Sequence, residues 1–295
     1  MLDLHRLRLL KELHTRGTLA AVAAALGYSS SAVSQQLALL EKEAGAPLLE
    51  RVGRGVRLTP QALILVGHAE VVLDRLEQAE AEIEASLTAP TGVVRLAAFQ
   101  TAMLSLMPPL LELLALDAPK LRLDAVQLEP DRALSLLTAG GCDLVLAEEY
   151  PGHPLPRMAG LDHVELGPDA MRLAVPPALA GRGLAQLADQ RWILEPADTE
   201  SGRWARALCR SAGFEPDVAF DSTDIVTHIR LVETGHAVAI LPDLVWPDRP
   251  PQGRELGHRR IYTCAREGTR QRPGVVAVRA GLRRVYSNRV GSPAP

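Results

Sequence analysis

The first residues whose types and spacing could do chemistry are hydroxyl and amide side chains near the N-terminus. Serines and a glutamine cluster between positions 29 and 35, whereas the hydrophobic residues of the same stretch recur every three to four positions. On a helix, this spacing would gather the polar side chains on one exposed face. Such a face can enter a DNA major groove and hydrogen-bond to base edges. The candidate base-contacting residues are Ser29, Ser30, Ser31, Ser34 and Gln35.

Three arginines follow at a regular spacing, and their chemistry suits phosphate groups. Arg51, Arg54 and Arg57 occupy every third position of a segment that reads as a β-ribbon. Its strands are expected at residues 48–51 and 56–58, because the glycines on either side of Arg54 favour a tight turn there. Guanidinium groups on this ribbon would contact the phosphates beside the groove.

No motif for catalysis or metal binding accompanies these residues. The sequence has no GxSxG elbow, no HExxH helix and no phosphate-cradling glycine loop. Cys142, Cys209 and Cys264 are isolated, so they predict neither disulfides nor a zinc site, and we expect no metal and no cofactor. Glu148 and Glu149 are the best acid–base candidates, but paired acids at a strand end more often face solvent or a ligand. We therefore do not expect an enzyme.

Three helices must position the polar face. Residues 3–15 predict an amphipathic helix, and residues 18–26 predict an alanine-rich helix. Gly27 then provides a turn before the serine-rich helix, because glycine tolerates a positive φ. Two short helices joined by a tight turn and followed by a ribbon indicate a winged helix-turn-helix, which we expect over residues 1–59.

The charge distribution supports a separate N-terminal module. The chain of 295 residues has a net charge of −3. Residues 1–59 carry eight Lys and Arg against five Asp and Glu, whereas residues 60–90 carry one Arg against six acids. A basic head on an acidic body is typical of a DNA-binding module joined to another domain. No apolar run approaches the ~20 residues of a membrane span, and no signal peptide is apparent, so we expect a cytoplasmic protein without membrane contact.

A long helix is predicted over residues 60–88. Thr59 and Pro60 form a helix start signal, and apolar residues then recur with a heptad spacing. Such a stripe favours a homodimer through the helix, with a homotetramer left open. The heptad residues are Ala62, Leu65, Ala69, Val72, Leu76, Ala79 and Ile83.

Beyond a hinge at residues 88–92, the pattern alternates between strands and helices. This alternation predicts parallel βαβ units, and the strands fall into two clusters on either side of Pro151–Pro156. We therefore expect two α/β lobes with a ligand between them. Strands are predicted at 93–99, 121–128, 142–149, 171–177, 191–196, 218–222, 237–242 and 260–265. Helices are predicted at 104–116, 131–138, 184–189, 201–212 and 224–234, with a closing segment at 272–286.

Residues spread over the whole chain carry a family resemblance. They include Leu4, Leu7, Leu10, Gly17, Thr18, Ala20, Ala21, Ala24, Leu26, Ser29, Ser31, Ala32, Val33, Ser34, Gln36, Leu40, Glu41, Gly45, Pro47, Leu48, Glu50, Arg51, Arg57, Leu58, Thr59 and Ala62, with the segments CDLVL at 142–146 and GHAVAILP at 235–242. With these residues the chain resembles the LysR-type transcriptional regulators. Ser30 and Gln35 stand where that family commonly has glutamine and arginine, so the preferred DNA sequence stays open.

The resemblance implies a fold, partners and site residues. The fold would be α+β overall, with the winged head, the linker helix and a two-lobed effector domain like a periplasmic binding protein at residues 92–295. The partners would be double-stranded DNA, a small-molecule effector and a second copy of the chain. The effector-binding residues carried over from the family are Gln100, Thr101, Ala102, Gln127, Thr199, Glu200, Ser201, Ser222 and Thr223.

Acidic residues suggest what the effector carries. Glu148, Glu195, Asp198 and Glu200 lie at or after the ends of predicted strands, and an acidic rim favours a ligand with a cation. The predicted helix start at Thr199–Ser201 instead favours a carboxylate. An amino acid would satisfy both, and a plain carboxylate is the alternative.

Two other functions stay open. One is a ligand-independent DNA-architectural protein, which would not need a two-lobed body. The other is an enzyme that carries a DNA-binding head. A DNA footprint that changes with a ligand would separate the regulator from the architectural protein.

Overall fold

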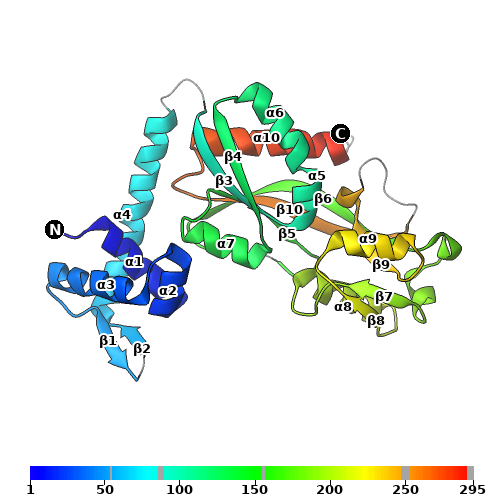
Figure 1. Ribbon diagram of the computed structural model, residues 1–295, viewed down its shortest axis with the longest axis horizontal. Coiled ribbons are helices and arrows are strands. Elements are labelled where there is room, and N and C mark those ends of the chain that lie inside the picture. The colour runs from blue at the N-terminus through cyan, green and yellow to red at the C-terminus, as the bar shows by residue number, and fades with distance from the viewer. Residues whose placement is uncertain (54, 86–89, 155–156, 247–252, 291–295) are drawn as a thin grey trace.

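The protein consists of an N-terminal head, a long helix and a two-lobed domain (Figure 1). The computed structural model describes residues 1–53, 55–85, 90–154, 157–246 and 253–290. This arrangement confirms the predicted fold class. Arg54 and the hinge residues Thr88 and Ala89 lie outside the described residues. In the ranges described, no helix combines the length and apolar character needed to cross a bilayer.

The head contains three helices and a β-ribbon that pack around one apolar core. Its helices begin at side-chain caps, since Asp3, Thr18 and Ser29 each accept a hydrogen bond from a backbone N–H three residues later, at 3.0–3.1 Å. Gly27 ends the second helix with a φ of 71°, which makes the tight turn possible. The elements are α1 (Leu4–Arg16), α2 (Leu19–Leu26), α3 (Ser30–Ala44), β1 (Leu49–Val52) and β2 (Gly55–Leu58).

The linker helix α4 (Pro60–Ala85) begins as predicted but packs differently. The Thr59 hydroxyl accepts a hydrogen bond from the Ala62 N–H at 3.1 Å, as expected of an N-cap. Ala62 and Ala69, predicted for a dimer stripe, are instead buried in the core of the head, where α4 packs against α1. The first half of α4 therefore packs on its own chain, and Ala62 and Ala69 are not available to a second copy. The later heptad residues Val72, Leu76, Ala79 and Ile83 are exposed.

A six-stranded mixed sheet extends through both lobes, one lobe also has a separate two-stranded sheet, and helices cover the sheets (Figure 1). We call lobe I the part formed by β3, β4, β5, α5, α6, α7 and α10, and lobe II the part formed by β7, β8, β9, α8 and α9. Lobe I has β3 (Gly92–Ala98), α5 (Gln100–Ser105), α6 (Met107–Asp117), β4 (Leu121–Gln127), α7 (Pro130–Thr138), β5 (Leu144–Glu149) and α10 (Pro273–Val290). Lobe II has β7 (Arg191–Leu194), α8 (Glu200–Ser211), β8 (Asp217–Asp221), α9 (Ile225–Glu233) and β9 (Ala239–Pro242). Short 3₁₀ turns lie at Pro177–Leu179, Leu184–Leu187 and Asp243–Val245.

Two long strands connect the lobes. They are β6 (Leu161–Ala174) and β10 (Glu255–Arg266), which pair antiparallel with each other. The strand order is β4-β3-β5-β10-β6-β9, in which β10 is antiparallel to β5 and β6 is antiparallel to β9. The expectation of parallel units was therefore wrong at the junction, because a strand that returns from the other lobe runs in the opposite direction.

Several predicted elements have different bounds. Strand β6 begins ten residues before the predicted 171–177, since Gly167 and Pro168 within it read as a turn in the sequence. The predicted helix 104–116 is two helices, α5 and α6, and Pro108 and Pro109 lie in the first turn of α6. The predicted helix 184–189 is a 3₁₀ turn.

Candidate functional site

The exposed face of α3 gathers the predicted base-contacting residues. Ser29 caps the helix and lies 3.0 Å from the hydroxyl of Ser31. Val33, Leu37 and Leu40 are buried on the opposite side, which holds the helix against the head. The structure places Ser29, Ser30, Ser31, Ser34 and Gln35 together in solvent.

The ribbon places Arg51 and Arg57 on different faces. Arg51 pairs in register with Val56, whereas Arg57 pairs with Glu50. Residues 50 and 51 are neighbours on a strand, so Arg51 and Arg57 project from opposite faces. Arg57 also forms an exposed ion pair with Glu50 at 2.8 Å, for which a phosphate would have to compete. The three-residue spacing therefore does not put Arg51 and Arg57 on a shared face.

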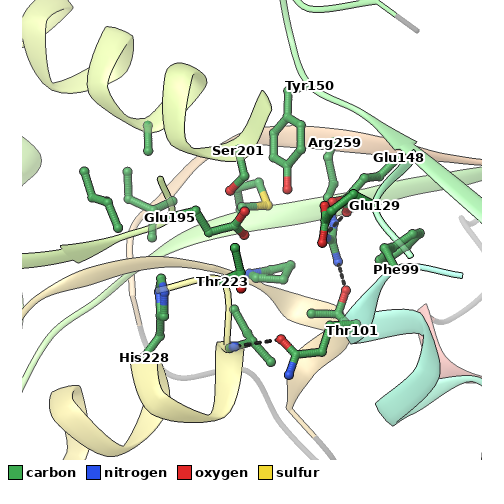
Figure 2. A pocket seen from close by; sticks show the side chains of 17 residues that line it. Phe99, Thr101, Glu129, Glu148, Tyr150, Glu195, Ser201, Thr223, His228 and Arg259 are labelled. Carbon is green, nitrogen blue, oxygen red and sulfur yellow. Dashed lines mark hydrogen bonds and ion pairs between the residues drawn. The ribbon is translucent and has the colours of Figure 1, made fainter. Parts of the chain in front are cut away.

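A small cavity lies between the two lobes (Figure 2). Its volume of about 30 Å³ leaves room for one or two water-sized groups. Apolar side chains such as Leu194, Ile225 and Ile240 form part of its wall. Polar groups come from both lobes: Gln100, Thr101, Glu129, Glu148 and Tyr150 from lobe I and its end, Glu195, Ser201, Thr223 and His228 from lobe II, and Arg259 from β10.

Arg259 is the buried cation of this cavity. It is 2% exposed, and its guanidinium pairs with Glu148 and with Asp169, whose Oδ2 is 2.8 Å from Nη2. Nη2 also donates to the Thr101 hydroxyl at 2.7 Å, and the group lies 5.1 Å from the ring centre of Phe99. Since two acidic side chains surround one cation, the network has no spare positive charge. The charge and the hydrogen-bond donors of Arg259 thus find their partners within the protein.

Two further carboxyl groups face the cavity. Burial, together with the nearby Glu148 and Glu129, raises the pKa of Glu195 to about 8, although hydrogen bonds from Ser201 and Thr199 act in the opposite direction. Burial also raises the pKa of Glu129, with Asp131 acting in the same direction. Figure 2 shows the carboxyl groups of Glu195 and Glu129 on opposite sides of the space. At neutral pH, Glu195 is therefore largely protonated.

His228 and Tyr150 complete the polar wall in neutral forms. His228 is buried, which lowers its pKa, and its Nε2 donates to the Ser222 carbonyl at 2.7 Å. Burial raises the pKa of Tyr150 well above its ordinary value. Neither side chain supplies a positive charge to the cavity.

Only part of the predicted effector set lines this cavity. Gln100, Thr101, Ser201 and Thr223 do. Gln100 also bridges the lobes, since its Nε2 donates to Asp224 and its Oε1 accepts from the Ile225 N–H, both at 2.8 Å.

The other five predicted residues lie elsewhere for identifiable reasons. Ala102 is buried in the core of lobe I, and Gln127 is exposed at the end of β4. Thr199 caps α8, and Glu200 pairs with His153 at 3.0 Å and with Arg203. The Ser222 hydroxyl accepts from the Asp224 N–H at 3.0 Å.

Sequence reasoning missed Arg259, Tyr150 and Glu129. Arg259 belongs to no recognisable sequence motif, and it lies just before the predicted strand 260–265. Glu129 was available as the residue before Pro130 at a helix start, but its side chain does not cap that helix. Their common position becomes visible only when the lobes are assembled.

Together, the head and the cavity define a ligand-responsive DNA-binding regulator. Residues 4–63 match the model of the bacterial regulatory helix-turn-helix protein, lysR family, and residues 88–287 match the LysR substrate binding domain. The chain belongs to the LysR family of transcriptional regulators, which confirms the resemblance. It is a DNA-binding transcriptional regulator with an effector-binding domain.

Individual relatives agree with this assignment. The chain is 27% identical over 243 residues to the transcriptional regulator TcbR of Pseudomonas sp. strain P51, covering 79% of this chain and 81% of TcbR. It is 28% identical over 289 residues to the regulator MetR of Escherichia coli K12, covering 92% and 87%.

Solved structures share the fold. Full-length OxyR from Pseudomonas aeruginosa, in a variant form, superposes with a TM-score of 0.64 at 20% identity, covering 97% of this chain and 95% of that one. CbnR in complex with its target DNA gives a TM-score of 0.52 at 24% identity, covering 97% and 100%.

Proposed function

We propose that this regulator reads a specific DNA sequence with α3 and responds to a small molecule bound between its lobes. The supporting observation is the inter-lobe cavity, whose polar lining comes from both lobes. A ligand that contacts both lobes can change their relative position, and this differential contact is what an effector needs. The proposed domains are the winged head at residues 1–59, the linker helix at 60–88 and the effector domain at 92–295.

Strand β10 provides a physical connection for this response. It carries Arg259 at the cavity and Arg266 at its other end. Arg266 pairs with Glu77 of the linker helix, with Nε 3.0 Å from Oε2, and donates to the carbonyls of Leu137 and Cys142 at 2.8 Å. A shift of β10 at the cavity would therefore move Arg266 and change its ion pair with Glu77 of α4.

The protein acts through binding rather than catalysis. Glu148, the best acid candidate in the sequence, pairs with Arg259, and Glu149 lies 3.5 Å from Arg157. Its place of action would be the cytoplasm, where its DNA is. The effector would be an amino acid or another small carboxylate on the sequence evidence alone.

The base-contacting and phosphate-contacting roles can be separated by two substitutions. Gln35→Ala should change which duplexes are selected from a randomised library, because it removes an amide from the base-reading face. Arg51→Ala should weaken binding to all duplexes alike and make the plot of log affinity against log salt shallower by about 0.9 per head. Selection from the library measures the first effect, and fluorescence anisotropy over a salt series measures the second. Arg54→Ala should behave like Arg51→Ala.

Arg122→Ala is the matched control, since Arg122 is an exposed arginine of the effector domain. It should leave the salt slope and the selected sequences unchanged. An unchanged salt slope for Arg51→Ala would contradict the role of the ribbon, and unchanged library selection for Gln35→Ala would contradict base reading by this face of α3.

We propose a homodimer through the exposed stripe of α4, with a tetramer left open. Val72 and Leu76 are 42% and 40% exposed, and Ile83 extends the same stripe. Replacing both Val72 and Leu76 with glutamate should give monomers in sedimentation velocity, because the added charges would be buried without partners in the dimer. Leu116→Glu, at an exposed apolar position on α6, should stay dimeric. A dimeric double variant would place the interface elsewhere.

A further inference from the structure

Arg259 is not available to an anionic ligand. Glu148, Asp169 and Thr101 already accept from its guanidinium, and Asp169 also accepts from the Leu244 N–H at 2.9 Å. A ligand carboxylate would have to displace a buried carboxylate from this network, leaving that group without a counter-ion. The cavity thus contains a cation that cannot serve as an anion receptor.

The remaining charges of the cavity are acidic and come from both lobes. Glu129 precedes α7 in lobe I and leaves the start of that helix uncapped by its side chain, whereas Glu195 follows β7 in lobe II. Among the residues that the structure describes, the ion pairs found include none to either carboxyl group. Glu129 and Glu195 therefore face the space without an ion-pair partner, and each adds a negative charge there whenever it is ionised.

The size and lining of the cavity match a cationic head group. An ammonium group is about the size of a water molecule, and the volume of about 30 Å³ accommodates such a group. Hydroxyls of Ser201 and Thr223 can accept its remaining N–H donors. The rest of a ligand would extend past Glu129, a partly solvent-exposed residue.

We propose that the effector bears a primary ammonium group, which binds between Glu129 and Glu195 and draws the two lobes together. The inference rests on the proposed function, because it assigns the chemical class of the effector to the inter-lobe cavity. It differs from the expectation from sequence in that a carboxylate alone does not suffice.

Lobe closure follows from the placement of the two acids. Without a cation, ionised Glu129 and Glu195 repel each other across the space, and proton uptake by Glu195 relieves this repulsion. A cation placed between them attracts one carboxylate from each lobe and favours ionised Glu195. Binding near neutral pH therefore releases a proton from Glu195, whose pKa of about 8 lies above that pH.

The test uses the full chain and simple probes. We expect 1,4-diaminobutane or L-lysine to raise the melting temperature, while 1,4-butanediol and succinate, of similar length, do not. In calorimetry at pH 7 in two buffers of different ionisation enthalpy, the active cation should release a proton. Glu195→Gln and Glu129→Gln should each weaken binding by roughly tenfold or more, as loss of a charge-assisted hydrogen bond implies. Glu195→Gln should also abolish the proton release.

Asp198→Asn is the matched control, because Asp198 is an exposed acid three residues from Glu195. It should bind like the parent chain. The proposal would be overturned if the cation still bound both Glu129→Gln and Glu195→Gln with unchanged affinity. It would also be overturned if only succinate or butanediol raised the melting temperature, although the proposed function of the cavity as an effector site would then still stand. If no probe raised the melting temperature, the proposal of a cationic effector would be wrong. Failure of the regulator assignment would instead appear in the DNA selection, which needs no effector.

Discussion

Replacing Arg259 with methionine should lower the free energy of unfolding by about 3–5 kcal/mol. Glu148 and Asp169 are 9% and 1% exposed, and this substitution leaves both carboxylates without their counter-ion. Methionine preserves much of the side-chain volume, so the loss reports the missing charge rather than a cavity. Urea unfolding of the effector domain, followed by tryptophan fluorescence at pH 7, measures it.

The adjacent arginine is the control for this experiment. Arg260 is exposed and interacts with Glu165 at 3.8 Å, so Arg260→Met should leave the stability almost unchanged. Burial already raises the pKa values of Glu148 and Asp169. Without Arg259 both would take up protons more readily, and the deficit of the variant should therefore shrink at pH 5. A loss below 1 kcal/mol at pH 7 would show that Arg259 does not hold the two carboxylates.

Glu195 should make the protein less stable as the pH rises from about 5 to about 8. Its pKa is about 8 in the folded chain, against an ordinary value of 4.5. Between these values the folded state binds a proton that the unfolded chain has released, so stability falls by up to about 1.4 kcal/mol per pH unit. Glu148 and Glu129 face Glu195 as acids, Tyr150 is a neutral phenol, and Ser201 donates a hydrogen bond.

Glu195→Gln should remove this contribution. The variant and the parent chain should be similar near pH 5, and the variant should be more stable near pH 8.5 by on the order of a few kcal/mol. Thermal unfolding at fixed ionic strength over this range measures the difference, with Asp198→Asn expected to keep the slope of the parent. If the stability of Glu195→Gln and of the parent chain depended on pH in the same way, the carboxyl group at this position would not be protonated in the folded chain.

The elements of the head could be predicted closely from the sequence because their signals are local. Thr18 and Ser29 cap helices through hydrogen bonds that reach only three residues, and Gly27 makes its turn through its own φ. The start of α4 at Thr59 follows the same rule. Such interactions join residues that are close in the sequence, so a short stretch of sequence is enough to predict them.

Several features of the body depended on contacts between distant segments. The heptad spacing of α4 could not reveal that Ala62 and Ala69 would be used by the core of the head, since the spacing identifies an apolar stripe and not its partner. Strand β6 was hidden by Gly167 and Pro168, which lie in a strand because β10 pairs with it. Residue type and helix or strand period were insufficient in both cases.

The sequence by itself determined the class of the protein, the winged head and the two-lobed character of its second half. These follow from motifs and hydrophobic periodicities that act over a few residues. The tertiary structure alone decided which side chains meet in the cavity. Arg259 reaches Glu148 and Thr101 across 111 and 158 positions of the chain. Pairs so far apart leave no periodic trace, and their chemistry arises only when β5, β10 and α5 are packed together.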